Sequence, residues 1–397
     1  MKSVSTRSVM ALTGNDAVAE AMRQINPDVV AAYPITPQTE LMHKFADYVA
    51  DGDVKTEFVL VESEHSAMSA AVGASAAGSR VVTATSANGL ALMWEILYIA
   101  ASTRCPIVMA DVNRALSAPI NIHCDHSDSM GARDAGWIHL HSENSQEAYD
   151  NMVMAVRIAE DRQVLLPVMV CLDGFILSHT IEPVEILADK TVRDFIGEFR
   201  PVHNLLDLDN PITFGPLDFH DYYFEHKIPQ IQAMKRAFGV IDGVAREFEK
   251  ISGRHYEHVE RYSTDDAERI VVALGSTCGT AKAVVDELRA GGEKVGLLKI
   301  RTFRPFPYEA VRQALGRAKA VAVLDRSHSF GAQSGPVSIE TRAALYHHAQ
   351  VPLKSYIYGL GGRDMSGDQV KQAFEELKSV AASGKSPDEL GLLGVRE

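Results

Sequence analysis

Cysteine is scarce in this sequence, and the few cysteines are far apart. The 397 residues include only Cys105, Cys124, Cys171 and Cys278. No two of them form a Cys-x-x-Cys pair, the usual scaffold for iron–sulfur clusters and structural zinc. A disulfide framework is also improbable in a chain this long with so few cysteines. We therefore expect no metal ligands, iron–sulfur cluster or disulfide network on this chain.

Long apolar runs and the common nucleotide-binding loops are also missing. No run approaches the ~18 apolar residues of a membrane-spanning helix, and residues 1–6 are too polar for a signal peptide. We expect a cytoplasmic protein. No Gly-x-Gly-x-x-Gly follows a strand-like run, and no Gly-x-x-x-x-Gly-Lys-Ser/Thr occurs. The glycines at 359–362 are the nearest match, and their spacing is wrong for a dinucleotide fingerprint.

Positive charge is in deficit. With 39 basic and 52 acidic residues, the formal net charge is −13. An acidic surface repels phosphate backbones and anionic lipids, which disfavours nucleic acid and membranes as partners. Hydrophobic residues at 46% and charged residues at 23% are ordinary for a globular protein. The length predicts two or three domains.

Strand-like runs alternate with helical patterns in residues 1–180 and again in residues 266–397. This alternation predicts an α/β fold with parallel sheets and helices on both faces. Residues 181–265 contain recurrent prolines and read as an extended connector ending in a long helix, Gln230–Ile251. The strands expected are Val29–Tyr33, Phe58–Val61, Val81–Thr85, Ile107–Asp111, Leu165–Leu172, Arg269–Leu274, Lys294–Ile300, Ala320–Leu324 and Leu353–Tyr358. The other helices expected are Asp16–Met22, Ser63–Ala77, Leu92–Ser102, Gln146–Glu160, Thr280–Ala290 and Tyr308–Ala318.

Two segments follow predicted strands, where open α/β sheets bind ligands. In Tyr33-Pro34-Ile35-Thr36-Pro37 the prolines restrict the backbone and hold the Thr36 hydroxyl in place. An ordinary proline-rich turn is the alternative. In Glu62-Ser63-Glu64-His65 two acids precede a small-residue helix. The helix dipole alone could explain them, although one of them could instead be a functional carboxyl.

A third segment begins at Arg114, just after the strand Ile107–Asp111. An arginine there can clamp a substrate carboxylate through two hydrogen bonds. Farther along, His123, Asp125, His126 and Asp128 could suggest a metal site. A structural loop or a subunit contact fits that irregular spacing better.

These segments resemble the α subunits of the pyruvate:ferredoxin oxidoreductase (pyruvate synthase) family, within the 2-oxoacid:ferredoxin oxidoreductases. The resemblance rests on YPITP at 33–37, VESEHSA at 61–67, NRALSAPINIHCDHSD at 113–128 and RDAGW at 133–137. In the C-terminal part it rests on FRPFP at 303–307, DRSHSFG at 325–331 and YGLGGRD at 358–364. The matches cover nearly the whole chain in the expected order.

The resemblance implies a thiamine diphosphate enzyme divided between subunits. Residues 1–180 would be the pyrimidine-binding domain and residues 266–397 a transketolase C-terminal-like domain. Tyr33, Pro34, Ile35 and Glu64 would bind the cofactor, with Glu64 on the pyrimidine nitrogen. Thr36 and Arg114 would hold the substrate, so that Glu64, Thr36 and Arg114 form the catalytic set.

The resemblance also implies partner subunits, because this chain lacks motifs that the family's enzymes need. It has no Gly-Asp-Gly motif, so Mg²⁺ and the diphosphate would be bound by a β subunit. The resemblance also implies 4Fe-4S clusters on β and on a ferredoxin-like δ subunit, a γ subunit, coenzyme A as co-substrate and ferredoxin as electron carrier. Assembly as a dimer of heteromers is expected, with no activity for the chain alone. The alternatives are a sister enzyme for a branched-chain, aryl or other 2-oxoacid, a non-redox decarboxylase half, and a non-catalytic assembly subunit.

Overall fold

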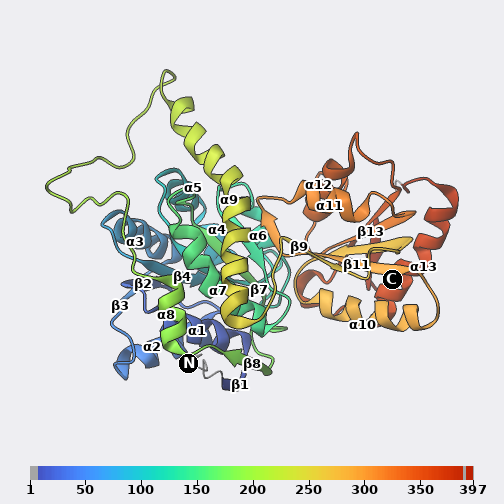
Figure 1. Ribbon diagram of the computed structural model, residues 1–397, viewed down its shortest axis with the longest axis horizontal. Coiled ribbons are helices and arrows are strands. Elements are labelled where there is room, and N and C mark those ends of the chain that lie inside the picture. The colour runs from blue at the N-terminus through green and yellow to red at the C-terminus, as the bar shows by residue number, and fades with distance from the viewer. Residues whose placement is uncertain (1–7, 388–389, 397) are drawn as a thin grey trace.

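Two mostly parallel sheets, one in each half of the chain, organise the molecule (Figure 1). The computed structural model describes residues 8–387 and 390–396. The predicted α/β class is confirmed. Among the described residues, no helix combines the length and apolar character needed to cross a membrane.

The first sheet has seven strands in the order β12-β6-β7-β5-β4-β2-β3. All neighbours are parallel except β12, which runs antiparallel to β6. Parallel strands need crossover connections, and their side chains are usually covered on both faces. The strands are β2 (Val29–Ala32), β3 (Glu57–Leu60), β4 (Val81–Thr85), β5 (Val108–Asn113), β6 (Ile138–His141), β7 (Val168–Asp173) and β12 (Thr302–Arg304).

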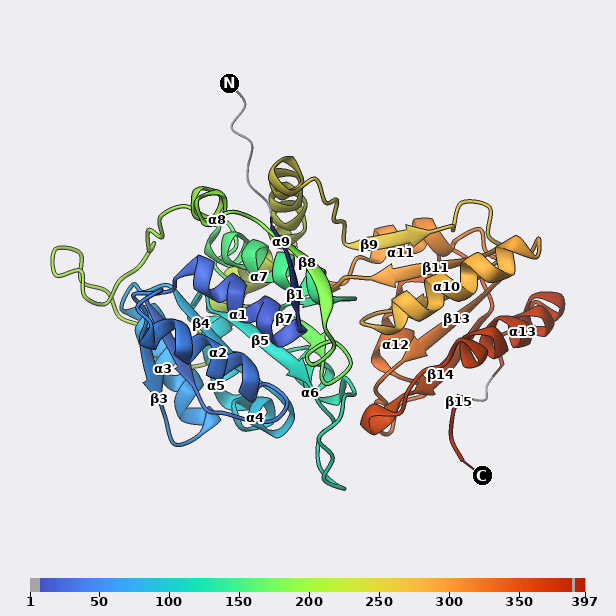
Figure 2. The same ribbon diagram turned by 90° about the horizontal axis from the view of Figure 1, so that it is seen from below.

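Helices cover both faces of this sheet, as Figure 2 shows. One core lies under α1, α2 and α7, and the other lies under α3 and α5. The antiparallel pair β1 (Ser8–Leu12) and β8 (Glu182–Ile186) forms a separate small sheet. The helices are α1 (Gly14–Ile25), α2 (Thr39–Ala50), α3 (Glu64–Ala76), α4 (Ala87–Leu92), α5 (Trp94–Ser102), α6 (Ser127–Gly131), α7 (Ser145–Glu160) and α8 (Asp189–Ile196).

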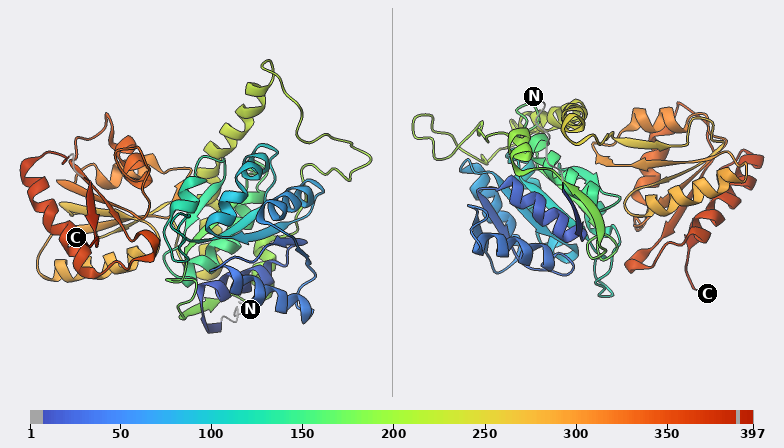
Figure 3. Two further views of the ribbon diagram at one scale, coloured as in Figure 1. Left: turned by 180° about the vertical axis from the view of Figure 1, so that it is seen from behind. Right: turned by 60° about the horizontal axis from the view of Figure 1, so that its bottom comes forward.

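Residues 197–222 contain no helix or strand, and part of this segment extends from the body as an arm before α9 (Figures 1 and 3). Its earlier part stays on the body, where the Leu205 N–H donates to the Ala76 carbonyl at 2.9 Å. Helix α9 runs from Tyr223 to Ser252, so the predicted start at Gln230 is wrong. Pro229 lies inside the helix, although it lacks the N–H that would bond to residue 225. The helix packs through its later turns, where Ile241 and Phe248 are buried.

The second sheet has six strands in the order β15-β14-β13-β10-β11-β9, and only β9 is antiparallel to its neighbour. The strands are β9 (Val259–Tyr262), β10 (Arg269–Ala273), β11 (Val295–Ile300), β13 (Ala320–Asp325), β14 (Leu353–Tyr358) and β15 (Gly391–Leu393). The helices are α10 (Thr277–Ala290), α11 (Tyr308–Leu315), α12 (Pro336–Leu345), α13 (Gly367–Ser383) and the 3₁₀ turn η1 (Leu360–Gly362).

Candidate functional site

Three predicted site segments meet at one edge of the first sheet. Parallel strands all end at the same edge, and the site segments follow β2, β3 and β5 there. Such an edge is where open α/β sheets bind ligands. The strand order places β4 between β2 and β5, so its own following residues, including α4, also belong to this edge.

Glu64 is the first residue of α3. The helix begins there because the Ser63 hydroxyl caps it, accepting from the Ser66 N–H at 3.2 Å. Only 7% of Glu64 is exposed, and its carboxylate has no hydrogen-bond partner among the described residues. Glu62, in contrast, is exposed and accepts a hydrogen bond from the Ser66 hydroxyl, which lowers its pKa. Of the two acids, only Glu64 is buried with free acceptors.

Gly89 in α4 makes room for that carboxylate. A Cβ at residue 89 would lie 2.7 Å from Glu64 Oε1 and 2.5 Å from Thr85 Oγ1. The Thr85 hydroxyl is itself buried and without a partner. Two polar groups with unused hydrogen-bonding capacity therefore pack against a glycine, and a larger residue at position 89 would displace them.

Arg114 and Thr36 are in direct contact. Arg114 Nη1 donates to the Thr36 carbonyl at 2.9 Å, and its Nε donates to the Asn121 carbonyl at 2.7 Å. Arg114 is 7% exposed, and burial lowers its pKa. Thr36 is exposed, and its hydroxyl has no partner in the described part of the chain. A substrate could thus meet a cation and a free hydroxyl at the same place.

The rest of the YPITP segment forms the wall beside Thr36. Tyr33 and Pro34 are exposed and Ile35 is half-buried. The Ile35 N–H donates to Gln38 Oε1 at 3.2 Å, and Gln38 Nε2 donates to the Ala84 carbonyl at 3.1 Å. The turn is thus fastened to the end of β4.

Asp128 links the arginine to α4. Its Oδ2 accepts from the backbone N–H of Arg114 at 2.8 Å and of Ala87 at 3.0 Å. Its Oδ1 accepts from Asn113 Nδ2 at 2.9 Å. Burial raises the pKa of Asp128 to about 6, and these hydrogen bonds oppose that rise. No hydrogen bond joins Glu64 to Arg114 or Thr36 among the described residues, but α4 contacts both sides of the site.

The His123–Asp128 segment does not gather around one centre. Asp125 accepts from Ser127 and from the N–H of Gly361, whereas His126 bonds to Asp173. The four side chains that suggested a metal site thus have separate structural partners. Sequence reasoning missed the roles of Asp128 and Gly89, and only their positions after strands could have hinted at them.

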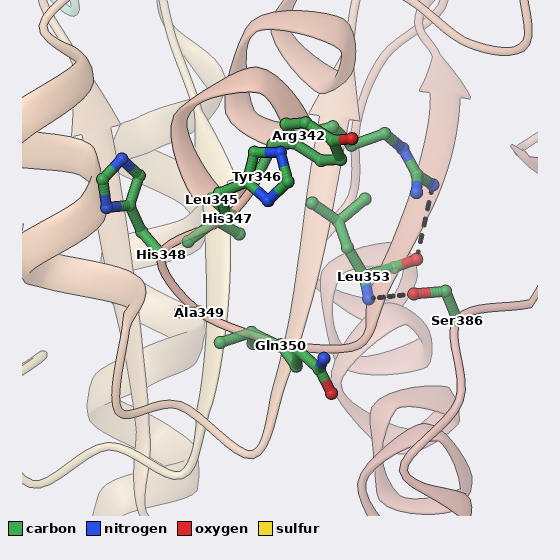
Figure 4. Close-up of a pocket in the computed structure, with 10 residues that line it drawn as sticks. Arg342, Leu345, Tyr346, His347, His348, Ala349, Gln350, Leu353 and Ser386 are labelled. Carbon is green, nitrogen blue, oxygen red and sulfur yellow. Dashed lines mark hydrogen bonds between the residues drawn. The ribbon is translucent and has the colours of Figure 1, made fainter.

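Two hollows lie elsewhere on the surface. One of about 750 Å³ lies between the loop after β5 and the loops at 327–330 and 360–361. Another of about 570 Å³ follows α12 in the second half, where Ser386 Oγ accepts from the Leu353 N–H at 2.9 Å (Figure 4). Of the candidate residues, Asp125 lines the first hollow, whereas Tyr33, Pro34, Ile35, Thr36, Glu64 and Arg114 line neither.

Comparison with known families decides the wider assignment. A family model described as pyruvate flavodoxin/ferredoxin oxidoreductase, thiamine diphosphate-binding, matches residues 20–246. A second model, pyruvate:ferredoxin oxidoreductase core domain II, matches residues 267–370. The chain belongs to the pyruvate:ferredoxin oxidoreductase family. The resemblance found in the sequence is therefore confirmed.

Relatives within this family match nearly the whole chain. The pyruvate synthase subunit PorA of Thermotoga maritima is 59% identical over 390 residues, covering 98% of both chains. PorA of Methanocaldococcus jannaschii is 50% identical over 94% of this chain and 95% of the relative. The ketoisovalerate oxidoreductase subunit VorA of Pyrococcus abyssi is 46% identical over 94% of both.

Solved structures show the same fold in more distant oxidoreductases and transketolases. The 2-oxoglutarate:ferredoxin oxidoreductase from Magnetococcus marinus has a TM-score of 0.73 at 21% identity, covering 93% of this chain and 65% of that one. An inactive β4 tetramer of a split-gene transketolase has a TM-score of 0.55 at 12% identity, covering 94% of this chain and 100% of that one.

Proposed function

We propose that the chain is the α subunit of a thiamine-diphosphate-dependent pyruvate:ferredoxin oxidoreductase. The enzyme would convert pyruvate, coenzyme A and oxidised ferredoxin to acetyl-CoA, CO₂ and reduced ferredoxin, reversibly. The observation that carries this proposal is the 59% identity to a pyruvate synthase subunit over 98% of both chains.

Pyruvate is favoured over the branched-chain alternative by the same comparison. PorA of Pyrococcus furiosus and VorA of Pyrococcus abyssi are both 46% identical to this chain, so that level does not separate the substrates. The relatives at 59% and 50% are both pyruvate synthase subunits.

The residues at the sheet edge fit the aminopyrimidine of thiamine diphosphate. A buried carboxylate without a partner needs a polar ligand to satisfy it, and Glu64 would bind the pyrimidine nitrogen. The glycine at 89 lets the Glu64 carboxylate keep its position against α4, and Tyr33, Pro34 and Ile35 would form the adjoining wall. When bound, the cofactor would supply the nucleophilic carbon and the electron sink that decarboxylation of a 2-oxoacid needs.

Arg114 and Thr36 would bind the substrate. The guanidinium would orient the pyruvate carboxylate, and the free Thr36 hydroxyl would donate to a substrate oxygen. Because the carboxylate leaves as CO₂, ground-state binding must stay moderate. The bonds from Arg114 to two backbone carbonyls fix its position before substrate arrives, which lowers the entropic cost of orientation.

The remaining parts of the enzyme would lie on other chains. We propose a β subunit that carries Mg²⁺, the diphosphate site and a 4Fe-4S cluster, together with γ and ferredoxin-like δ subunits. Residues 1–180 would bind the pyrimidine, 181–265 would connect, and 266–397 would serve chiefly as a structural and contact domain.

The test is reconstitution with the co-purifying chains and a viologen dye as electron acceptor. Dye reduction should require both pyruvate and coenzyme A, and kcat/KM for pyruvate should exceed that for 2-oxoisovalerate. Faster turnover of 2-oxoisovalerate would reassign the substrate. Absence of thiamine diphosphate and iron from the purified complex would reject the proposal altogether.

A further inference from the structure

Two histidines and a cysteine meet on one face of the first sheet. His139 and His141 lie on β6, and Cys171 lies on β7. Residues two apart on a strand face the same side, and His141 is the direct register partner of Cys171. Neighbouring strands are about 4.8 Å apart, so the three side chains share one face of the sheet. Their potential ligand atoms all lie within 4.8 Å of one another.

The two imidazoles have unused hydrogen-bonding capacity. His139 is fully buried and His141 is 1% exposed. Both ring nitrogens of each are buried, and no atom of residues 8–387 or 390–396 forms a hydrogen bond with them. Native proteins pair nearly all such groups with protein atoms, water or an ion. Four unpaired nitrogens beside one thiol therefore indicate that a bound species is part of this core.

The donor set identifies the class of that species. Two imidazole nitrogens and a thiolate are ligands of zinc and of other borderline-soft transition metals. Trp137, Met109 and Met169 belong to the same buried cluster as Cys171, and the His126 ring lies beside that of His141, with centroids 5.6 Å apart. A bound metal would therefore be sealed from solvent.

Charge balance points to a fourth group. Asp111 on β5 is the register partner of Cys171 on the other side of β7 from β6. It is buried; its Oδ2 accepts from Asn113 Nδ2 at 3.0 Å, and its Oδ1 has no hydrogen-bond partner in the part of the chain that the structure describes. One thiolate and one carboxylate would neutralise a divalent cation, which would otherwise be an uncompensated charge in the core.

We propose that His139, His141 and Cys171 form a structural site for a zinc-class divalent metal, with Asp111 compensating its charge. Zn–N bonds are about 2.0–2.1 Å and Zn–S bonds about 2.3 Å, so small side-chain rotations would bring the three atoms onto one ion. Binding would release the thiol proton and fasten β6 to β7. The site revises the expectation of no metal ligands, because that expectation considered only Cys-x-x-Cys spacing.

The test uses the assembled enzyme purified from zinc-replete cells, with any metal-binding tag removed. Elemental mass spectrometry should find ~1 zinc per chain beyond that of the partners. Cys171→Ser should lower that zinc at least tenfold, whereas Cys105→Ser, at a buried cysteine outside the group, should leave it unchanged. Wild-type complex without zinc or another transition metal at this level, or full retention by Cys171→Ser, would overturn the site and leave ordered water as the occupant.

Zinc-edge X-ray absorption of the wild-type complex keeps the test valid if Cys171→Ser does not fold. A shell with one sulfur and at least two nitrogens supports the site, and a shell of oxygens or of sulfurs alone rejects it. The iron of the clusters has its absorption edge at a different energy, so it does not contribute to the zinc spectrum. The measurement also does not depend on enzymatic activity. Failure here therefore leaves the proposed function untouched.

Discussion

A carboxylate withheld from both solvent and protein partners is unusual, and Glu64 is one. Removing an ionised group from water costs free energy unless a hydrogen bond or charge replaces the water. Helix α3 compensates in part, because its N-terminus lies at Glu64 and favours negative charge there. The remaining capacity is available to a ligand, which makes Glu64 the residue on which the catalytic proposal is most directly tested.

Glu64→Gln should lower kcat of the reconstituted complex by roughly 10²-fold or more, the scale of acid–base contributions. The amide keeps the size of the side chain and removes the carboxylate. Glu62→Gln is the matched control, because Glu62 is exposed two residues away, and it should retain wild-type turnover. Steady-state viologen reduction measures both. Wild-type turnover in Glu64→Gln would remove the residue from the cofactor site.

Arg114→Ala should lower kcat/KM for pyruvate roughly tenfold to a hundredfold. That loss corresponds to about 1.5–3 kcal/mol of transition-state stabilisation, the scale of a lost charged hydrogen bond. Arg114→Lys should recover only part of the loss, because lysine cannot reproduce the two-carbonyl contact and a bidentate clamp together. Activity with both variants across a pyruvate series separates KM from kcat. An unchanged kcat/KM in Arg114→Ala would contradict the clamp.

Helix α4 connects the part of the site around Glu64 with the part around Arg114. It begins after β4, the strand between those that carry Thr36 and Arg114, and Ala87 in its first turn donates to Asp128. Gly89 in the same short helix lies against Glu64. A shift of α4 would therefore disturb the acid and the arginine together, although neither residue belongs to it.

Gly89→Ala should reduce activity strongly while leaving the fold intact. The added Cβ would lie 2.7 Å from Glu64 Oε1, so the carboxylate must rotate away from its position. Gly73→Ala in α3 is the control, because nothing lies within 4 Å of its added Cβ. That change should be neutral or stabilise by about 0.5–1 kcal/mol. Circular dichroism and cofactor binding by calorimetry distinguish the two; equal cofactor affinity in both would contradict the role of Gly89.

The sequence predicts elements well where apolar side chains dominate. The parallel strands β4, β5, β7 and β10 lie close to their expected positions because their residues are buried on both faces. Strand β6 was missed because His139 and His141 occupy one face of a strand only four residues long. The expected helix Leu92–Ser102 is α5, which begins two residues later at Trp94, whereas the short helix α4, which ends at Leu92, was not predicted.

The site was predictable only in part for a related reason. The contact between Arg114 and Thr36 follows from their positions after β5 and β2, and the family resemblance named both residues. Asp128 is 14 positions from Arg114, and Gly89 is 25 positions from Glu64. Their contacts with these residues form only in the folded chain, so no local sequence pattern predicts them. The assignment of Tyr33, Pro34, Ile35, Thr36, Glu64 and Arg114 to ligand binding stays a prediction.

The two halves of the molecule are joined by a buried polar network. Asp173, at the end of β7, accepts from His126 Nε2 at 2.8 Å, from Arg326 Nη1 at 3.1 Å and from the Ser276 hydroxyl at 2.5 Å. Ser276 and Arg326 belong to the second half, whereas His126 belongs to the site loop. The Asp173 carboxylate thus bonds to residues of both halves of the molecule. The pairing of β12 with β6 is a second connection between the halves.

Asp173→Asn should destabilise the chain by about 3–5 kcal/mol, because it leaves the buried Arg326 without a counter-charge. Asp194→Asn is the control: its exposed pair with Lys190 should contribute at most about 1 kcal/mol. Urea denaturation of the purified chain at neutral pH measures both. Equal urea midpoints for the two variants would show that the buried network around Asp173 stabilises the chain no more than the exposed pair of Asp194 with Lys190.

The same carboxylate predicts the direction of the pH dependence. Burial alone would raise the pKa of Asp173, but the charges of His126 and Arg326 outweigh it and hold the pKa well below its usual range. A depressed folded-state pKa means stability that is complete above the ordinary value of about 3.9 and is lost as pH falls below it. Wild-type stability should therefore fall more steeply than that of Asp173→Asn as the pH falls from about 4 to about 2. If the unfolding free energies of the two proteins fall in parallel, the acid-sensitive contacts lie elsewhere. If they converge at low pH, the contacts of Asp173 between the two halves are the acid-sensitive ones.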